Sequence, residues 1–196
     1  MAKQTINIGT TANDGTGDPL RTAMTKTNDN FTELYNTPGW GFYVDDLSTP
    51  TISIGTTPTK LTINGLGAGS SSDYLPYEIR GISELWDTSA NKFTPINVGD
   101  SYTTRINFTV ASESGNPTDI TLLLDIGGSG TPTNVVLEKH IAAGKVVPYS
   151  ISIASPTFAG ATQVANGAQL FINTDSGTIT VGERSIFISR LSNGNL

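Results

Sequence analysis

Short β-type runs separated by turn residues follow one another through most of this chain, and they constrain its fold more than any other feature. β-Branched and aromatic residues favour strands, whereas Asn, Asp, Ser, Gly and Pro favour turns. Only 14% of the residues are charged, against about 25% in an average protein. Many closely spaced strands without a second helical pattern predict a mainly β protein, an antiparallel β-sandwich or barrel. The predicted strands are 42–46, 51–54, 60–64, 77–85, 102–111, 119–126, 134–141, 146–154, 161–165, 169–173, 178–181 and 185–191.

Three of these strands lack the alternation of apolar and polar residues that is typical of a sheet with one wet face. They are the centre of 185–191 and the runs Leu122–Leu124 and Val135–Leu137. A continuous apolar run of this kind is typical of a strand that is covered on both faces. A jelly roll packed in a compact trimer would account for all three runs, and a thick monomeric core is the alternative. Between the later strands, Asn166-Gly167 predicts a two-residue hairpin turn, and Asp175–Gly177 and Gly182-Glu183 predict the next two turns.

A single helix is predicted before the strands, from Pro19 to about Tyr35. Asp18 suits the N-cap, and Pro19 suits the first helical position because its missing N–H would be unpaired there anyway. Pro38 prevents continuation. The chain therefore divides into residues 1–36, an N-terminal arm and amphipathic helix, residues 37–41, a hinge, and residues 42–196, a β-sandwich head.

One face of this helix has the spacing of a short coiled coil, in steps of four and three residues. In the arm before it, two isoleucines share a face if the arm is extended. We predict that this surface serves attachment or oligomerisation, and packing against the protein's own head is the alternative. The predicted residues are Ile6, Ile8, Leu20, Met24, Thr27, Phe31, Leu34 and Tyr35.

Composition excludes several classes of partner. The net charge is −6, and the 11 Lys and Arg residues are scattered without an adjacent pair, so the chain lacks the clustered positive charge that nucleic-acid binding requires. No stretch approaches the ~18 apolar residues of a membrane span, and we expect no secretion signal. Without cysteine there are no disulfides or thiolate metal sites.

The search for catalytic or metal-binding residues gives little, and we predict a non-enzymatic protein without cofactor or metal. His140 is the only histidine, and it falls in a predicted strand, whereas a catalytic triad needs a histidine within reach of a nucleophile. Asp45 and Asp46 are adjacent, so a strand would point them to opposite faces. Asp14 and Asp18 flank Gly-Thr-Gly but lack the alternating ligands of a calcium loop. We interpret them as turn and cap residues.

Aromatic residues leave one binding alternative open. Trp40, Tyr43 and Trp86 could form a platform on which a glycan stacks, although burial in the core is the more usual position of tryptophan.

The arm, turn and helix together are the most specific motif. They contain Asn13-Asp14-Gly15-Thr16-Gly17-Asp18, then Leu20-Arg21, Lys26, Asn30-Phe31 and Glu33-Leu34-Tyr35. This motif resembles a segment that recurs near the amino terminus of virion proteins of tailed bacteriophages, particularly fibre and appendage proteins. The resemblance spans residues 6–35 of the 196, and the remainder looks like the jelly-roll heads of phage appendages.

The resemblance implies a virion structural protein whose N-terminal segment lies nearest the particle and whose head is trimeric. The implied partners are copies of itself and other virion proteins of the capsid, neck, baseplate or tail. The chain lacks the repeats of a long fibre shaft, so we expect a trimeric capsid decoration or cement protein or a short surface fibre. It would be assembled in the host cytoplasm and displayed on the virion surface. The alternative is a tail-fibre or spike protein that recognises host surface glycan.

Overall fold

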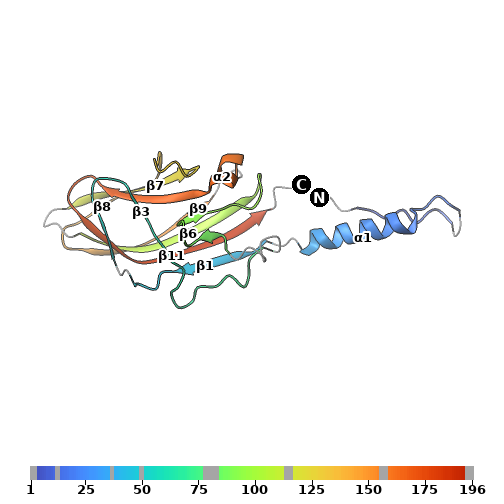
Figure 1. Cartoon of the computed structure of the whole chain (residues 1–196), viewed down its shortest axis with the longest axis horizontal. Helices are drawn as coiled ribbons and strands as arrows, with labels where there is room; N and C mark the ends of the chain where they lie inside the picture. The colour runs from blue at the N-terminus through green and yellow to red at the C-terminus, as the bar shows by residue number, and fades with distance from the viewer. Residues whose placement is uncertain are drawn as a thin grey trace.

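The computed structural model describes residues 4–11, 14–35, 38–48, 51–76, 84–112, 117–154 and 159–192. Most of the chain forms a two-layered β-sandwich, and one helix stands beyond one end of it (Figure 1). The helices are α1 (Leu20–Tyr35) and α2 (Ala161–Asn166). The strands are β1 (Trp40–Val44), β2 (Thr51–Ile54), β3 (Thr59–Lys60), β4 (Trp86–Asp87), β5 (Lys92–Phe93), β6 (Ser101–Ser112), β7 (Thr118–Ile126), β8 (Asn134–Ile141), β9 (Val146–Ala154), β10 (Ala168–Thr174) and β11 (Ile179–Ser192).

The strand order identifies the sandwich as a jelly roll. In the first sheet β1 and β2 both pair with one edge of β11, which is followed by β6 and β9. In the second sheet β3 and β5 both pair with one edge of β10, which is followed by β7 and β8. All pairings are antiparallel. The short strand β4 pairs with β5 at the edge of the second sheet. If β4 is left aside, and β1 with β2 and β3 with β5 each count as one strand position, the spatial orders are 1-8-3-6 and 2-7-4-5. Two interlocked Greek keys have this order, so the predicted fold class is confirmed.

The core lies between the two sheets and follows from the two-residue period of their strands. In β6 the inward positions Ile106, Phe108 and Val110 are buried, whereas Asn107 and Thr109 between them are only partly buried. Ile120 and Leu122 of β7 face this core from the second sheet and are fully buried. Because side chains alternate between faces along a strand, the threonine-rich positions of β6 fall on the outer face.

The segment 161–165, predicted as a strand, is instead the short helix α2, and Asn166-Gly167 is not a hairpin turn. Gly167 ends the helix with a positive φ of 81°, and its N–H donates to the carbonyl of Gln163 at 2.7 Å. A Cβ at Gly167 would lie 2.8 Å from the carbonyl oxygen of Phe93, so the site suits glycine alone. Alanine is the strongest helix former, and a positive-φ glycine is a common helix end.

The runs 178–181 and 185–191, predicted as two strands, form the single strand β11. The predicted turn at Gly182-Glu183 is a β-bulge, since the pairing with β6 shifts between Gly182 and Ser185 and Glu183 has a φ of 49°. A bulge inserts a residue without ending the strand. The centre of β11 is apolar on both faces because aromatic neighbours within the chain contact Phe187.

The remaining boundaries show where local signals suffice. Helix α1 ends at Tyr35 as predicted, and β2, β8 and β9 have the predicted bounds. Strand β1 begins at Trp40, inside the segment predicted as a hinge. Much of the predicted strand 77–85 lies outside the described residues. No helix in the described part of the chain is long and apolar enough to cross a membrane.

Candidate attachment stalk and surface sites

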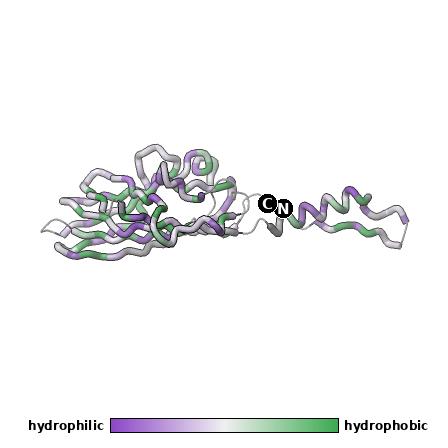
Figure 2. The backbone as a smooth tube through the Cα atoms, turned by 60° about the horizontal axis from the view of Figure 1, so that its bottom comes forward, coloured by the Kyte–Doolittle hydropathy of each residue, from purple (hydrophilic) through white to green (hydrophobic). Residues whose placement is uncertain are grey.

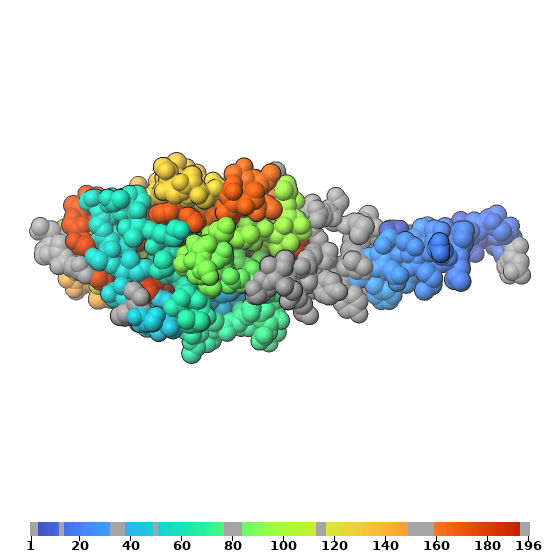
Figure 3. Space-filling model, viewed as in Figure 1, coloured from blue at the N-terminus to red at the C-terminus, as the bar shows by residue number. Residues whose placement is uncertain are grey.

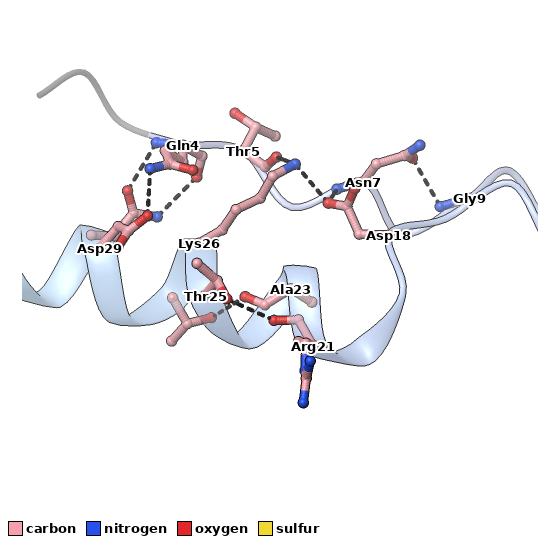
Figure 4. A network of polar contacts seen from close by, with 12 residues as sticks. Gln4, Thr5, Asn7, Gly9, Asp18, Arg21, Ala23, Thr25, Lys26 and Asp29 are labelled. Atoms are coloured by element: carbon pink, nitrogen blue, oxygen red, sulfur yellow. Dashed lines mark hydrogen bonds and ion pairs between the residues drawn. The ribbon is translucent and has the colours of Figure 1, made fainter.

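The arm (residues 4–11) runs back along α1 and is held there by side-chain hydrogen bonds (Figure 4). At its start, the Gln4 N–H donates to Asn30 Oδ1 and Asn30 Nδ2 donates to the Gln4 carbonyl, both at 2.8 Å. In its middle, Lys26 Nζ donates to the Thr5 carbonyl at 3.1 Å. We call the arm, the loop after it and α1 together the stalk. These contacts join residues more than 20 positions apart, so the stalk is a hairpin with tertiary structure of its own.

Asp18 is part of this hairpin and does not cap α1 in the predicted way. Its Oδ2 accepts from Lys26 Nζ at 2.7 Å and from the Asn7 N–H at 2.8 Å. The bond from Lys26, followed by that from Asn7, lowers the pKa of Asp18. The pairs that the structure describes include none from this carboxylate to the first turn of α1. The side chain therefore fastens the arm to the helix, a role that only the folded hairpin creates.

Asp14 organises the loop between arm and helix. Its carboxylate accepts from the N–H groups of Thr10, Thr11 and Thr16 at 2.7–2.9 Å and from the Thr10 hydroxyl at 2.7 Å. These donors, the Thr16 N–H first, hold the pKa of Asp14 far below its ordinary value. Its oxygens are engaged within the loop, in agreement with the turn role inferred from the sequence. Among the described residues no group of His, Cys, Asp and Glu could hold a metal ion.

The predicted apolar stripe lies open on α1. Leu20 is 78% exposed, and Met24 and Phe31 are each 52% exposed. Apolar and polar stretches alternate along the helix in Figure 2. The helix projects from the end of the sandwich instead of lying on it (Figures 1 and 3). Residues 20, 24 and 31 fall on one helix face because steps of four and seven are close to whole turns of 3.6 residues.

The other predicted stalk residues differ in exposure. Ile8 is 88% exposed, whereas Ile6 and Thr27 are half-buried. The Thr27 hydroxyl donates to the Ala23 carbonyl of the preceding turn at 3.0 Å. The side chains of Leu34 and Tyr35 lie outside the described residues. The role of the whole set in attachment stays a prediction.

The predicted glycan platform is not a surface feature. Trp86 is fully buried, and its indole N–H donates to the Ile63 carbonyl at 3.0 Å. Tyr43 is also buried, and its hydroxyl accepts from the Leu85 N–H at 2.6 Å. Trp40 alone of the three is half-exposed. Because the sandwich core encloses Tyr43 and Trp86, neither ring can stack on a sugar.

A different set of aromatic residues forms a row over β1 and β11, and the predicted platform shares only Trp40 with it. Trp40 stacks on Tyr74 with ring centroids 4.7 Å apart, and its ring packs at a tilt against Phe187 with centroids 5.5 Å apart. Phe42 lies 6.5 Å from the same Phe187 ring, and the Arg105 guanidinium lies 5.8 Å from it. We call Trp40, Phe42, Tyr74 and Phe187 the aromatic row. Residues of three distant segments meet in it, so no local motif announces it.

Two further titratable residues singled out in the sequence, Asp45 and His140, each contact an oppositely ionisable side chain. Asp45 is buried against Arg184, which removes the adjacent pair Asp45-Asp46 from consideration as two accessible carboxylates. His140 is exposed on β8, and its Nδ1 lies 2.7 Å from Asp119 Oδ1 on β7. His140 lines a shallow hollow with acidic neighbours, and in the described part of the chain its one hydrogen-bond partner is Asp119. No hydrogen bond joins His140 to a Ser or Thr hydroxyl among the residues that the structure describes.

No protein-family model matches the chain, and no curated protein matches it. Among solved structures, it is similar to Eiger TNF from S. frugiperda (10% identity, TM-score 0.47, 81% of this chain and 96% of that chain covered). It is also similar to vertex protein P5 of PRD1 (11%, 0.38, 80% and 98%) and to the cowpea mosaic virus top component (9%, 0.27, 81% and 83%). The last two are components of virus particles by name. At these identities and scores the likeness concerns the fold alone.

Proposed function

We propose that this chain is a non-enzymatic structural protein of a tailed-phage virion. Three copies would assemble through their stalks, and the stalk would join the trimer to another virion protein. The jelly roll would be displayed on the particle surface, as a capsid decoration or cement protein or a short surface fibre. The observation that supports the proposal best is the open stripe on α1, on a helix that stands clear of its own sandwich.

The energetics favour a covered stripe. Burying a fully exposed apolar side chain of this size contributes about 1.5–3 kcal/mol. With the exposures of Leu20, Met24 and Phe31, covering the three contributes roughly 3–5 kcal/mol per chain. The spacing of these residues is that of a coiled-coil seam, in which each apolar side chain fits between residues of a neighbouring helix. Three stalks around one axis therefore supply the missing partner surface.

The arm, which is hydrogen-bonded along α1, supports an attachment role for the stalk. Its hydrogen bonds to α1 use the helix face that carries Lys26 and Asn30, and this leaves the apolar stripe free. Ile8, at the outer end of the arm, adds a further exposed apolar residue. A stalk built in this way presents one face to its copies and its tip to a different virion protein.

The test is a triple substitution, Leu20→Ser with Met24→Ser and Phe31→Ser, which removes the stripe without touching the arm contacts. We expect a monomer in sedimentation velocity and loss of the protein from particles assembled in its presence. Circular dichroism should retain the β signal, because the sandwich core contains none of these residues.

The matched control changes three other exposed residues of the same helix, Arg21→Ser, Thr22→Ser and Thr25→Ser. This variant should remain trimeric and join particles. If the stripe variant stays trimeric and is incorporated as well as the control, the stalk assignment is wrong.

A further inference from the structure

The aromatic row ends at a residue that is held open to solvent. Tyr74 is 58% exposed, and its ring is backed by Trp40, which in turn packs on Phe187. The Trp40 N–H also donates to the Tyr74 carbonyl at 2.8 Å, so both backbone and ring of Tyr74 are fixed. An aromatic ring that is already immobile loses little conformational entropy when a ligand covers it.

A hollow of about 270 Å³ lies beside this row, and hydroxyl groups line much of it. We call it the serine hollow. The loop that carries its serines is bound to β1, since the N–H groups of Phe42 and Ser71 each donate to the other's carbonyl at 2.9 and 2.8 Å. The same loop carries Tyr74, so ring and hollow are parts of one fixed surface. The described lining residues are Phe42, Tyr43, Asn64, Gly65, Leu66, Ser70, Ser71, Ser72, Glu84 and Thr88.

The polar groups of the serine hollow retain capacity for a ligand. The Glu84 carboxylate accepts from the N–H and the hydroxyl of Thr88 at 3.3 and 3.2 Å. A carboxylate has about four acceptor positions, so this one can accept further hydrogen bonds. Ser72 is exposed at the rim, and a hydroxyl both donates and accepts. Leu66, 74% exposed, adds an apolar edge.

An exposed flat ring next to clustered hydroxyls and one carboxylate matches the chemistry of a pyranose, which has an apolar C–H face and a rim of hydroxyls. Glu84 is the one charged residue among the described lining residues, and the chain carries a net charge of −6. Both charges disfavour an acidic sugar, because like charges repel. We propose that this surface binds a neutral oligosaccharide, with one sugar ring stacked on Tyr74 and the next hydrogen-bonded in the serine hollow. The inference goes beyond the attachment role and does not depend on it.

The experiment titrates the full chain with cellohexaose, maltohexaose and chitohexaose as neutral probes and with hexagalacturonate as the acidic probe. Binding is followed by calorimetry and by saturation-transfer NMR. We expect saturable binding of at least one neutral probe with a Kd below about 5 mM, and a Kd for the acidic probe that is at least about tenfold higher. Tyr74→Ala should weaken the affinity for the neutral probe by about tenfold or more, and Tyr74→Phe should retain most of that affinity.

The matched control is Val146→Ala, which truncates an exposed apolar residue (69%) on β9, away from the row. It should bind like the unmodified chain. Three results would overturn the proposal: no neutral probe binds, Tyr74→Ala binds as well as the control, or the acidic probe binds equally. A fall in oligomeric mass on Tyr74→Ala would also overturn it, since the row would then be a contact between copies. The stripe variant of the stalk separates the two proposals, because it should bind the sugar unchanged.

Discussion

Replacing Asp100 by alanine should destabilise the sandwich by about 3–5 kcal/mol, because it removes the carboxylate that pairs with the buried guanidinium of Arg190. Asp100 is fully buried, and Arg190 on β11 is 1% exposed. Asp100 Oδ1 accepts from Arg190 NH2 at 2.9 Å. Its Oδ2 accepts from the Tyr102 hydroxyl at 2.8 Å and from the Asn97 N–H at 3.1 Å. One carboxylate therefore accepts from at least three donors in the core.

The magnitude follows from burial more than from the ion pair itself. An exposed ion pair contributes about 0–1 kcal/mol, because water screens it and solvates either partner alone. In the core the guanidinium has no water to replace the lost carboxylate, so the whole desolvation cost appears on truncation. For a chain of this size each kcal/mol lowers Tm by about 2–4 °C. A loss of about 4 kcal/mol therefore corresponds to a fall of about 8–16 °C.

Urea unfolding followed by circular dichroism measures the change, and the chain supplies a matched control. Asp119 also pairs with a basic side chain, with Oδ1 2.7 Å from His140 Nδ1, but both side chains are more than half exposed. Asp119→Ala should therefore lower the free energy of unfolding by less than about 1 kcal/mol. If Asp100→Ala costs as little as Asp119→Ala, burial does not set the strength of this network and the reasoning fails.

Three further outcomes follow from the stalk and the core. Lys26→Met should loosen the middle of the arm, because Lys26 bridges the Thr5 carbonyl and Asp18. The Asn7 N–H donates to the same Asp18 carboxylate, so its protection against exchange should fall by NMR while that of the helix amides is kept, and an Asn7 amide that stays fully protected contradicts this. Asp14 has a lowered pKa, so its contribution is complete above its ordinary value of 3.8 and is lost as the pH falls through the lowered value. Protection of the loop amides should therefore fall on strong acidification, and Asp14→Asn should lack this dependence. Trp86→Phe leaves the Ile63 carbonyl without its donor in the core and should cost about 1–3 kcal/mol in urea unfolding, whereas unchanged stability would show that the bond contributes nothing.

Local signals in the sequence were enough to predict the helix and most of the strands. The end of α1 at Tyr35 follows from apolar spacing and a nearby proline, and β8 and β9 follow from runs of β-forming residues between turns. The same reasoning wrongly predicted a strand at residues 161–165, because a six-residue helix is too short to show the 3.6-residue spacing of apolar side chains. Whether a strand continues through a bulge, as β11 does at Glu183, depends on its pairing with β6 and not on local residue type.

The surface residues were harder to predict than the fold. The fold buries Trp86 and leaves Trp40 half-exposed. Tyr74 carries no motif, and its exposed, stacked position depends on the pairing of its loop with β1. Asp18 was predicted to cap a helix, but in the folded hairpin its carboxylate accepts hydrogen bonds from Lys26 and Asn7 instead.

Strand period, turn chemistry and helix spacing are properties of neighbouring residues, so they were sufficient to predict a β-sandwich preceded by one amphipathic helix. Four features follow only from the folded chain: the jelly-roll strand order, the helix clear of the sandwich, the arm bound along that helix, and the aromatic row with its serine hollow. Each of these depends on contacts between residues far apart in the chain. Burial and pairing across such distances are set by how whole sheets pack, and no local pattern encodes them.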